Sequence, residues 1–511
     1  MTGTANSTAR WLLALGISFV LGACVAVPAW RSDPADGSAQ AGCLALIRGM
    51  DEAVAAQDVG DAGAARMKTF PYLRIDRFLT SFRHELSAPG AFEDWVDHLR
   101  WLDARAREIE ASNLPAEARA SLAADHGIAH PENLAAAANR CGDLLLQAEV
   151  MNGSAEARDA LVRAAVPPSH YNNWVRAAGL YPITNLGAVI GYARWKDENT
   201  GSFALPDEPP APSDNIVSYV PAATVDREQA SRIVRAAPRT ALGLPKFSAD
   251  DVAQLTATFA PVFEIETESG DDRLGAPVWR REDGELLPAV DVSRPVASTR
   301  IVYTRFEGRV LPQLVYTVWF PARPLQGEFD LLGGRIDGFI WRVTLDENGE
   351  PLIYDTIHPC GCYHMFFPVA PLVRVPVPED RDTREAPLVP KDAPRLAPGE
   401  RIHLRLASVS HYLLNLGARK PAATPATYEL QSVWAAPDFG PRSLSLPEGG
   451  RRSFYGPSGI VPHTERLERF TLWPLGIESP GAMRQWGTHA TAFVGEAHFD
   501  EPFLIDEAFA R

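Results

Sequence analysis

The N-terminal part of the chain repeats apolar residues at helical spacing. Over 73–86 they recur every three or four residues, and 92–102 repeats the pattern after a Pro-Gly break. Such spacing places the apolar side chains on one face of an amphipathic helix. Residues 134–150 form another helical segment of this kind. We therefore predict an all-α bundle over residues 40–199.

The pattern changes after a Pro-rich stretch at 200–248, which we predict to be a linker because closely spaced prolines cannot sustain a helix. Beyond it, short runs have the alternation typical of strands with one buried face. They cover 259–267, 301–306, 314–320, 339–345, 352–357, 403–407 and 428–434. Asn348-Gly349 is a strong hairpin turn. We predict an antiparallel, sandwich-like β-rich domain over 249–511, with a Pro-rich surface excursion at 368–398, and hence an α+β fold.

The first thirty residues have the pattern of an export leader rather than of the fold. Trp11 to Val27 is an apolar run that follows Arg10, as in a signal peptide. Within it, Leu21-Gly22-Ala23-Cys24 resembles the lipobox of bacterial lipoproteins, in which the Cys is acylated and becomes the new N-terminus. Cleavage after Ala29 and an uncleaved anchor remain alternatives. We expect a bacterial envelope protein that is tethered to a membrane through Cys24 and faces the periplasm or the exterior.

Charge narrows the choice of partners. The 511 residues include 49 Lys and Arg against 64 Asp and Glu, which gives a net charge of −15. A nucleic acid would be repelled by such a surface, and no basic stripe offsets the repulsion. The expected partners are the lipid bilayer, through the N-terminal anchor, and an envelope protein.

The cysteine count agrees with export and acylation. Five cysteines are present, so acylation of Cys24 would leave an even number. Cys43 and Cys141 both lie on predicted helices, and their disulfide would stabilise the fold by about 4–5 kcal/mol in the chain-entropy model. Cys360 and Cys362 are the other expected pair.

The segment His358-Pro359-Cys360-Gly361-Cys362-Tyr363-His364 carries the clearest candidate chemistry. In an extended strand, His358, Cys360, Cys362 and His364 would share one face. With a bend at Gly361 they could bind one metal ion, and thiolates with imidazoles suit Zn or Cu. Without the bend, further ligands would have to come from elsewhere. The candidates are His411, His463, His489 and His498.

Two other readings of the Cys360/Cys362 pair stay open, because export favours disulfides. The bridge could be structural and inert, or it could be a redox couple, since a bridge across one glycine is strained and easily reduced.

Other polar residues are weaker candidates. Asp355 is expected to form an ion pair with an arginine at a strand edge. Arg484 and His489 could line a pocket, although an exposed or capped loop position is the favoured reading of each. Three residues at alternating positions could form a carboxylate–imidazole ligand set, namely Glu496, His498 and Asp500. Arg305 and Arg323 are expected to pair with surface carboxylates. The sequence contains no nucleophile elbow, phosphate-binding loop, His-Glu-x-x-His helix or dinucleotide fingerprint.

One stretch resembles a known fold. Asp337 to Val343, the Asn348-Gly349 turn and Tyr354 to His358 are similar to the central strands of the necrosis-inducing cytolysins, which are β-sandwiches. The metal motif of that family, His-Asp-Trp-Glu, is not matched, because Arg342 stands where the Glu would be and no His-Asp precedes Trp341. The resemblance therefore implies a sandwich and no site.

As a whole the chain resembles uncharacterised bacterial lipoproteins. We expect a tethered envelope protein with a structural or interaction role. The alternative is a metal-binding or redox enzyme that uses the His358–His364 segment.

Overall fold

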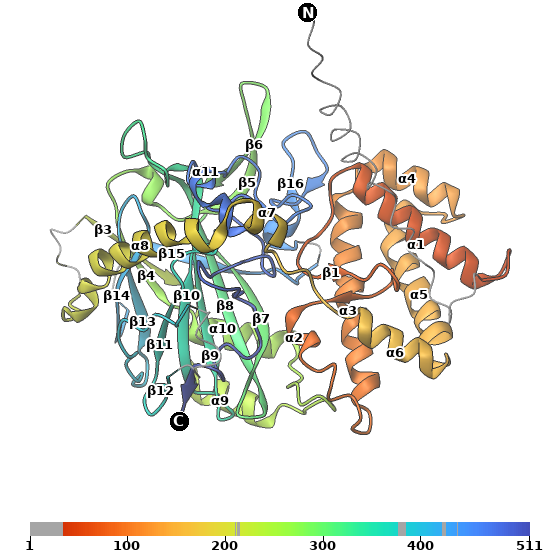
Figure 1. Ribbon diagram of the computed structural model, residues 1–511, viewed down its shortest axis with the longest axis horizontal. Coiled ribbons are helices and arrows are strands. Elements are labelled where there is room, and N and C mark those ends of the chain that lie inside the picture. The colour runs from red at the N-terminus through yellow and green to blue at the C-terminus, as the bar shows by residue number, and fades with distance from the viewer. Residues whose placement is uncertain (1–33, 210, 212–214, 377–384, 422–425, 437) are drawn as a thin grey trace, which may run out of the picture.

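The structure is a computed structural model that describes residues 34–511 except 210, 212–214, 377–384, 422–425 and 437. The predicted leader, residues 1–30, and its Cys24 lie outside the described residues. Figure 1 shows helices gathered at the N-terminal side and a large curled sheet beside them. The predicted α+β class is confirmed.

The helical part packs around α3, whose Trp95, Val96 and Leu99 are fully buried. Its first helix is capped by Ser38, whose hydroxyl accepts a hydrogen bond from the Ala41 backbone N–H. The helices are α1 (Ala39–Ala56), α2 (Arg77–Thr80), α3 (Ala91–Asn113), α4 (Ala116–Asp125), the short η1 (Pro131–Asn133), α5 (Leu134–Leu146), η2 (Gln147–Met151) and α6 (Ala155–Ala164). A small ladder joins β1 (Ala65–Arg66) to β2 (Arg74–Ile75).

The prediction of a helix over 73–86 is wrong. Only α2, with four residues, is helical there, and the stretch begins as strand β2. The backbone of Arg74 pairs with Arg66, and its guanidinium is fully buried among carboxylates. These tertiary contacts override the local helical pattern.

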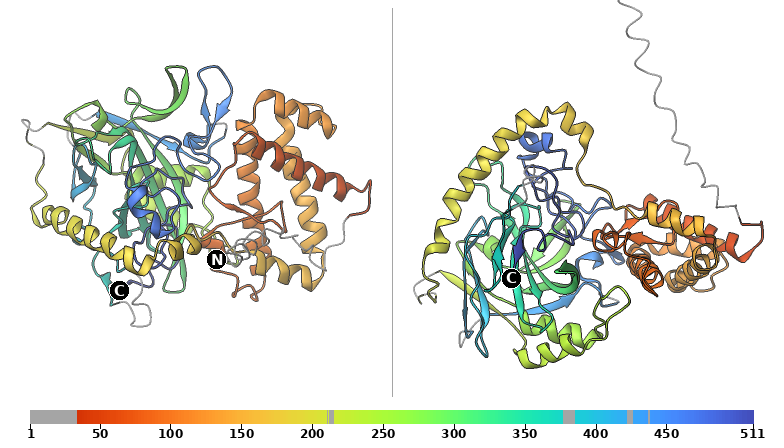
Figure 2. Two further views of the ribbon diagram at one scale, coloured as in Figure 1. Left: turned by 45° about the horizontal axis from the view of Figure 1, so that its top comes forward. Right: turned by 60° about the horizontal axis from the view of Figure 1, so that its bottom comes forward.

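Two helices after the bundle cross to the sheet. They are α7 (Asn173–Ala178) and α8 (Tyr181–Asn199), and Figure 2 shows α8 arching over the sheet. Tyr181 donates a hydrogen bond to the Phe493 carbonyl over 2.7 Å. The Trp195 ring lies 4.7 Å from that of Tyr363. Residues 173–199 thus pack on the sheet, which differs from a bundle that extends to 199.

Ten strands form one mixed sheet in the order β11-β10-β9-β8-β7-β15-β3-β4-β13-β14. The strands are β3 (Ile216–Pro221), β4 (Val262–Glu266), β7 (Val296–Phe306), β8 (Arg309–Arg323), β9 (Gly334–Leu345), β10 (Pro351–Ile357), β11 (Met365–Pro368), β13 (Arg401–Leu406), β14 (Leu413–Arg419) and β15 (Ala426–Ser432). The predicted hairpins are antiparallel, but β15 runs parallel to β3 and β7, and β13 runs parallel to β4.

The segment expected to be only a linker, 200–248, contributes structure. It contains β3, near the middle of the sheet, and the helix α9 (Arg227–Ala236). With α10 (Ala249–Phe259), α9 packs on the concave side of the strands, where Tyr316 donates to the Thr256 carbonyl. The core between them holds fully buried aromatic side chains such as Phe263 and Trp341.

Smaller elements complete the fold. They are η3 (Gly201–Ala204), η4 (Gly270–Asp272), β5 (Ala276–Glu282), β6 (Glu285–Asp291), β12 (Val373–Arg374), η6 (Gly440–Arg442), β16 (Leu444–Ser445), β17 (Arg451–Arg452), α11 (Arg469–Leu472), η7 (Trp473–Leu475) and β18 (Phe509–Ala510). Within the described ranges, no helix has both the length and the apolar character needed to cross a bilayer.

Candidate functional site

The His358–His364 segment is a tight turn between β10 and β11, not an extended strand. The Gly361 N–H donates to the His358 carbonyl, and the His358 N–H donates to the Cys362 carbonyl. Gly361 has φ +95°, and a Cβ there would lie 2.4 Å from the Ala490 carbonyl oxygen, so only glycine fits. The bend at Gly361 is present, but the alternation that would align the four side chains is lost.

The two histidines of the segment bind different carboxylates. His364 Nε2 lies 2.8 Å from Asp355, and His358 Nδ1 lies 3.7 Å from Asp337. Among the described residues, which include all four expected ligands, no three His, Cys, Asp or Glu side chains are grouped so that they could hold a metal ion. The Zn or Cu site expected from the alternation is therefore not formed in this structure.

Cys360 and Cys362 are free thiols here, not the expected disulfide. A hydrogen bond between the Cys362 thiol and Cys360, together with burial, raises the pKa of Cys362 well above its usual value. Cys362 is thus held as a neutral thiol, which is a poor nucleophile. The bridge expected between Cys43 and Cys141 is confirmed, and it joins α1 to α5.

Two buried carboxylates enclose His411. Its Nδ1 lies 2.8 Å from Asp337, its Nε2 lies 3.5 Å from Asp272, and its ring stacks on Phe320. Burial opposes the charge, but the two carboxylates outweigh it and raise the pKa of His411. The imidazole therefore acts as a buried counter-charge that binds β14 and η4 to β9.

Asp355 is buried deep in the sheet and not at a strand edge. Arg342 donates to both of its oxygens, over 2.8 and 2.6 Å, and also to the Phe499 carbonyl. The predicted pairing of Asp355 with an arginine is confirmed, but the predicted location at a strand edge is wrong. Both side chains are at most 2% exposed, so the pair is a structural element of β9 and β10.

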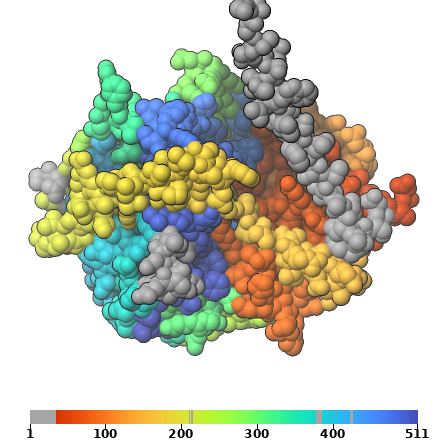
Figure 3. All heavy atoms as spheres, viewed as in Figure 1, coloured from red at the N-terminus to blue at the C-terminus, as the bar shows by residue number. Residues whose placement is uncertain are grey.

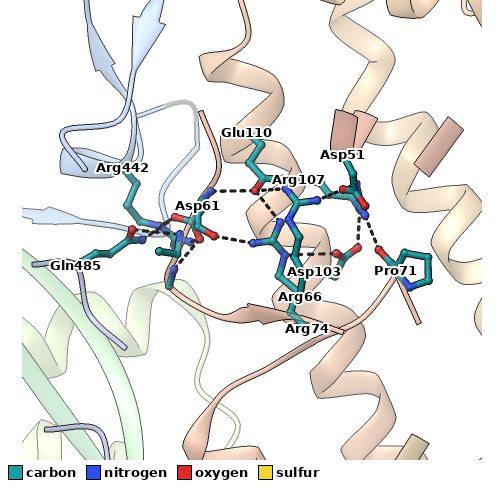
Figure 4. Close-up of polar contacts among 12 residues, drawn as sticks. Asp51, Asp61, Arg66, Pro71, Arg74, Asp103, Arg107, Glu110, Arg442 and Gln485 are labelled. Carbon is teal, nitrogen blue, oxygen red and sulfur yellow. Dashed lines mark hydrogen bonds and ion pairs between the residues drawn. The ribbon is translucent and has the colours of Figure 1, made fainter. Parts of the chain in front are cut away.

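A larger network of charges joins the helical part to the sheet part (Figure 4). At its centre, Asp61 accepts hydrogen bonds from Arg442 over 2.9 and 2.7 Å, and from Gln485 over 2.7 Å. Burial would raise the pKa of Asp61, but Arg442 and Arg74 lower it to about 2. The carboxylate is ionised and fixes η6 to the loop after α1.

The same network continues into the bundle. Arg74 donates to the Asp61 carbonyl and to Glu110, and Arg107 binds Asp103 over 2.8 Å. Every one of these side chains is at most 2% exposed. Because the charges alternate in sign, each is compensated and the network is a structural connection rather than a binding site.

The C-terminal candidates do not converge. Glu496 pairs with Arg176, His498 with Glu501 and Asp500 with Arg77. The ligand set expected from their spacing is thus absent from this structure. Arg484 and His489, in contrast, are both buried and line one small cavity.

Of the two arginines predicted to pair with surface carboxylates, only one does so among the residues that the structure describes. Arg305 binds Glu85 through two hydrogen bonds of 2.8 and 2.6 Å, so its expected carboxylate is confirmed. Arg323 instead donates to the Tyr412 hydroxyl. Of the further candidate ligands, His463 is exposed and lies 3.7 Å from Glu285.

An apolar surface on α7 and α8 was not predicted from the sequence. Ile183, Leu186 and Ile190 recur at helical spacing and are 61–71% exposed, and Trp174 on α7 is 87% exposed. None of the residues of α8 is fully buried. Figure 3 shows α8 as a band across this face of the molecule.

Neighbouring segments extend this surface. The helix η7 packs against α7 and α8, and α11 packs against η7. These two helices expose Trp473 and Phe470. The loop between β8 and β9, which binds Glu468 through the Leu331 carbonyl, exposes Phe329. We call these residues of α7, α8, α11 and η7, namely Trp174, Ile183, Leu186, Ile190, Phe470 and Trp473, the apolar face.

Comparison with known proteins gives no relative from which a function could be transferred. No protein-family model, no curated protein and no solved structure matches the chain.

Proposed function

We propose that this protein is an exported bacterial envelope protein, acylated at Cys24, that rests on the bilayer surface through the apolar face and has a binding role rather than a catalytic one. The observation that carries the proposal is the apolar face itself. Exposed contiguous apolar surface on a folded protein marks a site of interaction with a protein or a membrane.

The composition of the apolar face favours lipid. Aliphatic side chains of α8 stand beside the aromatic rings of Trp174, Trp473 and Phe470. Tryptophan and other aromatic residues are enriched where proteins meet the boundary between headgroups and acyl chains. A helix that lies in this boundary exposes one apolar face, as α8 does.

The distribution of charge also favours contact of the apolar face with lipid. The chain carries a net charge of −15 and 22% charged residues, yet Asn172 to Tyr192 contains a single charged residue, Arg176. Anionic headgroups would repel the average surface of this protein but not this segment. The α7 and α8 part of the apolar face therefore lacks the negative charge that would keep it from an anionic bilayer.

A tether would make a weak surface contact effective. The stretch from Cys24 to Pro34 can reach at most about 35 Å, so an acylated chain holds the folded body next to the bilayer. Under that constraint, contact between the apolar face and lipid becomes an intramolecular event with a high effective concentration.

The experiment uses full-length protein in vesicles of phosphatidylethanolamine and phosphatidylglycerol that contain brominated acyl chains. We expect the bromines to quench tryptophan fluorescence. Trp174→Phe should lose part of this quenching because its ring lies in the interface. Trp101→Phe is the matched control, since Trp101 is 46% exposed on α3, away from the apolar face.

A second comparison removes the aliphatic residues. The triple variant Ile183→Ser, Leu186→Ser, Ile190→Ser should lower the quenching of Trp174, whereas serine at the exposed Leu144, Val292 and Val373 should not. Equal quenching in the Trp174 and Trp101 variants would refute contact with lipid. Self-association that the first triple variant abolishes would instead assign the apolar face to a second copy of the chain.

A further inference from the structure

A small cavity lies where β7 faces η6 and the 484–489 segment. Its free volume is about 20 Å³, counted as the space that the centre of a water molecule can reach. The lining includes Arg300, Arg442 and Arg484, together with His489. A space of this size excludes nucleotides and cofactors and admits a compact ion or a few waters.

The Arg300 side chain has no carboxylate bonded to it, and Asp61 and Asp500 act on its charge only from a distance. Arg300 is 9% exposed, and its side chain forms no hydrogen bond or ion pair within the described part of the chain. Its guanidinium lies 5.3 Å from the Trp486 ring and 5.6 Å from the Trp434 ring. Burial and the neighbouring Arg442 lower the pKa of Arg300 to about 9, which still leaves it charged at neutral pH.

Other polar atoms around the cavity are also unpaired. Arg442 NH1, Arg484 Nε, Ser298 Oγ and both ring nitrogens of His489 are buried without a hydrogen-bond partner among the described atoms. Burial, reinforced by Arg484, lowers the pKa of His489 to about 3, so its imidazole is neutral. Leaving one such buried group unsatisfied costs about 1–3 kcal/mol.

The charges of the lining do not cancel. Arg442 is balanced by Asp61 through two hydrogen bonds. Arg484 donates only to the backbone carbonyls of Glu478 and Ser479. The guanidinium groups of Arg300 and Arg484 therefore have no carboxylate hydrogen-bonded to them among the described residues. Waters could complete the hydrogen bonds, but they could not offset the charge.

We infer that this cavity binds a small oxyanion, and the two guanidinium groups without a bonded carboxylate point to a dianion of the size of phosphate or sulfate. Guanidinium groups recognise the oxygens of such ions through paired N–H donors. Arg300 and Arg484 supply the charge, while Ser298 and His489 supply further hydrogen-bonding groups. The site adds a ligand to the binding role and does not depend on the acyl tether or the apolar face.

Isothermal titration calorimetry of the full chain in a Tris-chloride buffer tests this inference, with inorganic phosphate, sulfate and acetate as separate probes. We expect one binding event per chain. Stronger binding of phosphate and sulfate identifies a tetrahedral dianion, and stronger binding of acetate identifies a carboxylate. Arg300→Gln should weaken binding by at least about tenfold, because it removes a charged hydrogen-bonding partner. Arg281→Gln is the control, since Arg281 is exposed and paired with Glu448.

Thermal unfolding separates loss of the site from loss of the fold. Arg300→Gln removes an unpaired buried charge, so its midpoint without ligand should equal or exceed that of the wild type. Phosphate should raise the midpoint of the wild type and of Arg281→Gln but not that of Arg300→Gln. If Arg300→Gln fails to fold, Arg484→Gln takes its place. The inference is overturned if no anion binds the wild type, or if both cavity variants bind as tightly as Arg281→Gln.

Discussion

Several arginines are among the largest fully buried side chains of this protein, notably Arg74, Arg107 and Arg342. Each is matched by carboxylates or backbone carbonyls. Removing one partner of a buried ion pair strands the other charge, which destabilises a protein far more than loss of a surface pair does. The stability of this fold therefore depends on a few exact pairings.

Asp61 provides the clearest test of this dependence. Asp61→Asn leaves Arg442 without its counter-charge, and we expect the free energy of unfolding to fall by about 3–5 kcal/mol. Urea denaturation at pH 7 measures this change. Asp143→Asn is the matched control, because Asp143 also binds an arginine but is 66% exposed. It should cost at most about 1 kcal/mol.

The pH dependence of the same residue has a definite sign. The pKa of Asp61 is about 2 in the folded protein against 3.8 for an unperturbed aspartate. The stabilisation is therefore complete above pH 3.8 and is lost as the pH falls toward 2. The difference in the free energy of unfolding between the wild type and Asp61→Asn should therefore become smaller as the pH falls through this range. A gap that stays constant down to pH 2 would show that the ionised carboxylate does not contribute.

Sequence reasoning could not have found most of these pairings. Asp61 and Arg442 lie hundreds of residues apart, and no local pattern connects them. One signal was available on α3, where Asp103, Arg107 and Glu110 share a face at helical spacing. Charges on the inward face of a helix indicate a buried network, although they do not identify its partners.

At the scale of elements, the predictions that held rest on local chemistry. The predicted turn at Asn348-Gly349 has a positive φ at Gly349 and joins the antiparallel strands β9 and β10. The strands that were not predicted correctly pair with segments far away in the sequence. β3 contains Pro221 and follows a Pro-rich stretch, yet it pairs with β4 and β15 near the middle of the sheet. The alternating pattern of the His358–His364 segment led to a wrong prediction of an extended strand for a local reason, because one glycine bends the segment into a turn.

The disulfide between α1 and α5 gives a prediction at this scale. Cys43→Ser with Cys141→Ser should lower the free energy of unfolding by about 2–5 kcal/mol, because the unfolded chain regains the freedom of a long loop. Chemical denaturation of the oxidised wild type and of the variant measures the difference.

Thiol titration of the denatured, unreduced protein is the companion measurement. Cys360 and Cys362 should react and Cys43 and Cys141 should not. After full reduction all four should react. Reaction of Cys43 with the thiol reagent before reduction would contradict the bridge. If Cys360 and Cys362 did not react before reduction, they would form a disulfide in the purified protein.

For the whole molecule, the division into a helical part and a sheet part followed from periodicity, but its boundary did not. α7 and α8 continue the helical pattern and yet pack on the sheet. Periodicity reports which residues are apolar and cannot report which body buries them. The apolar face was missed for this reason, since an exposed apolar stripe has the same spacing as a buried one.

Acylation is the prediction that belongs to the complete chain. Mass spectrometry of the mature protein should find an N-terminal Cys24 that carries acyl chains, and Cys24→Ala should abolish this modification. An unmodified N-terminus near residue 30 would contradict the tether. The quenching experiment would then apply to protein added to vesicles from solution.

The order of the strands has a consequence for how the polypeptide acquires its shape. β15 lies between β7 and β3, and it pairs in parallel with both. It follows β3 by roughly two hundred residues, and contacts so distant in sequence form slowly. A chain that is made in N-to-C order can complete its helical bundle early, but the middle of the sheet must wait for Ala426 to Ser432. Until then β3 and β7 have edges without their final neighbour, which makes this interval the one in which a chaperone would matter most.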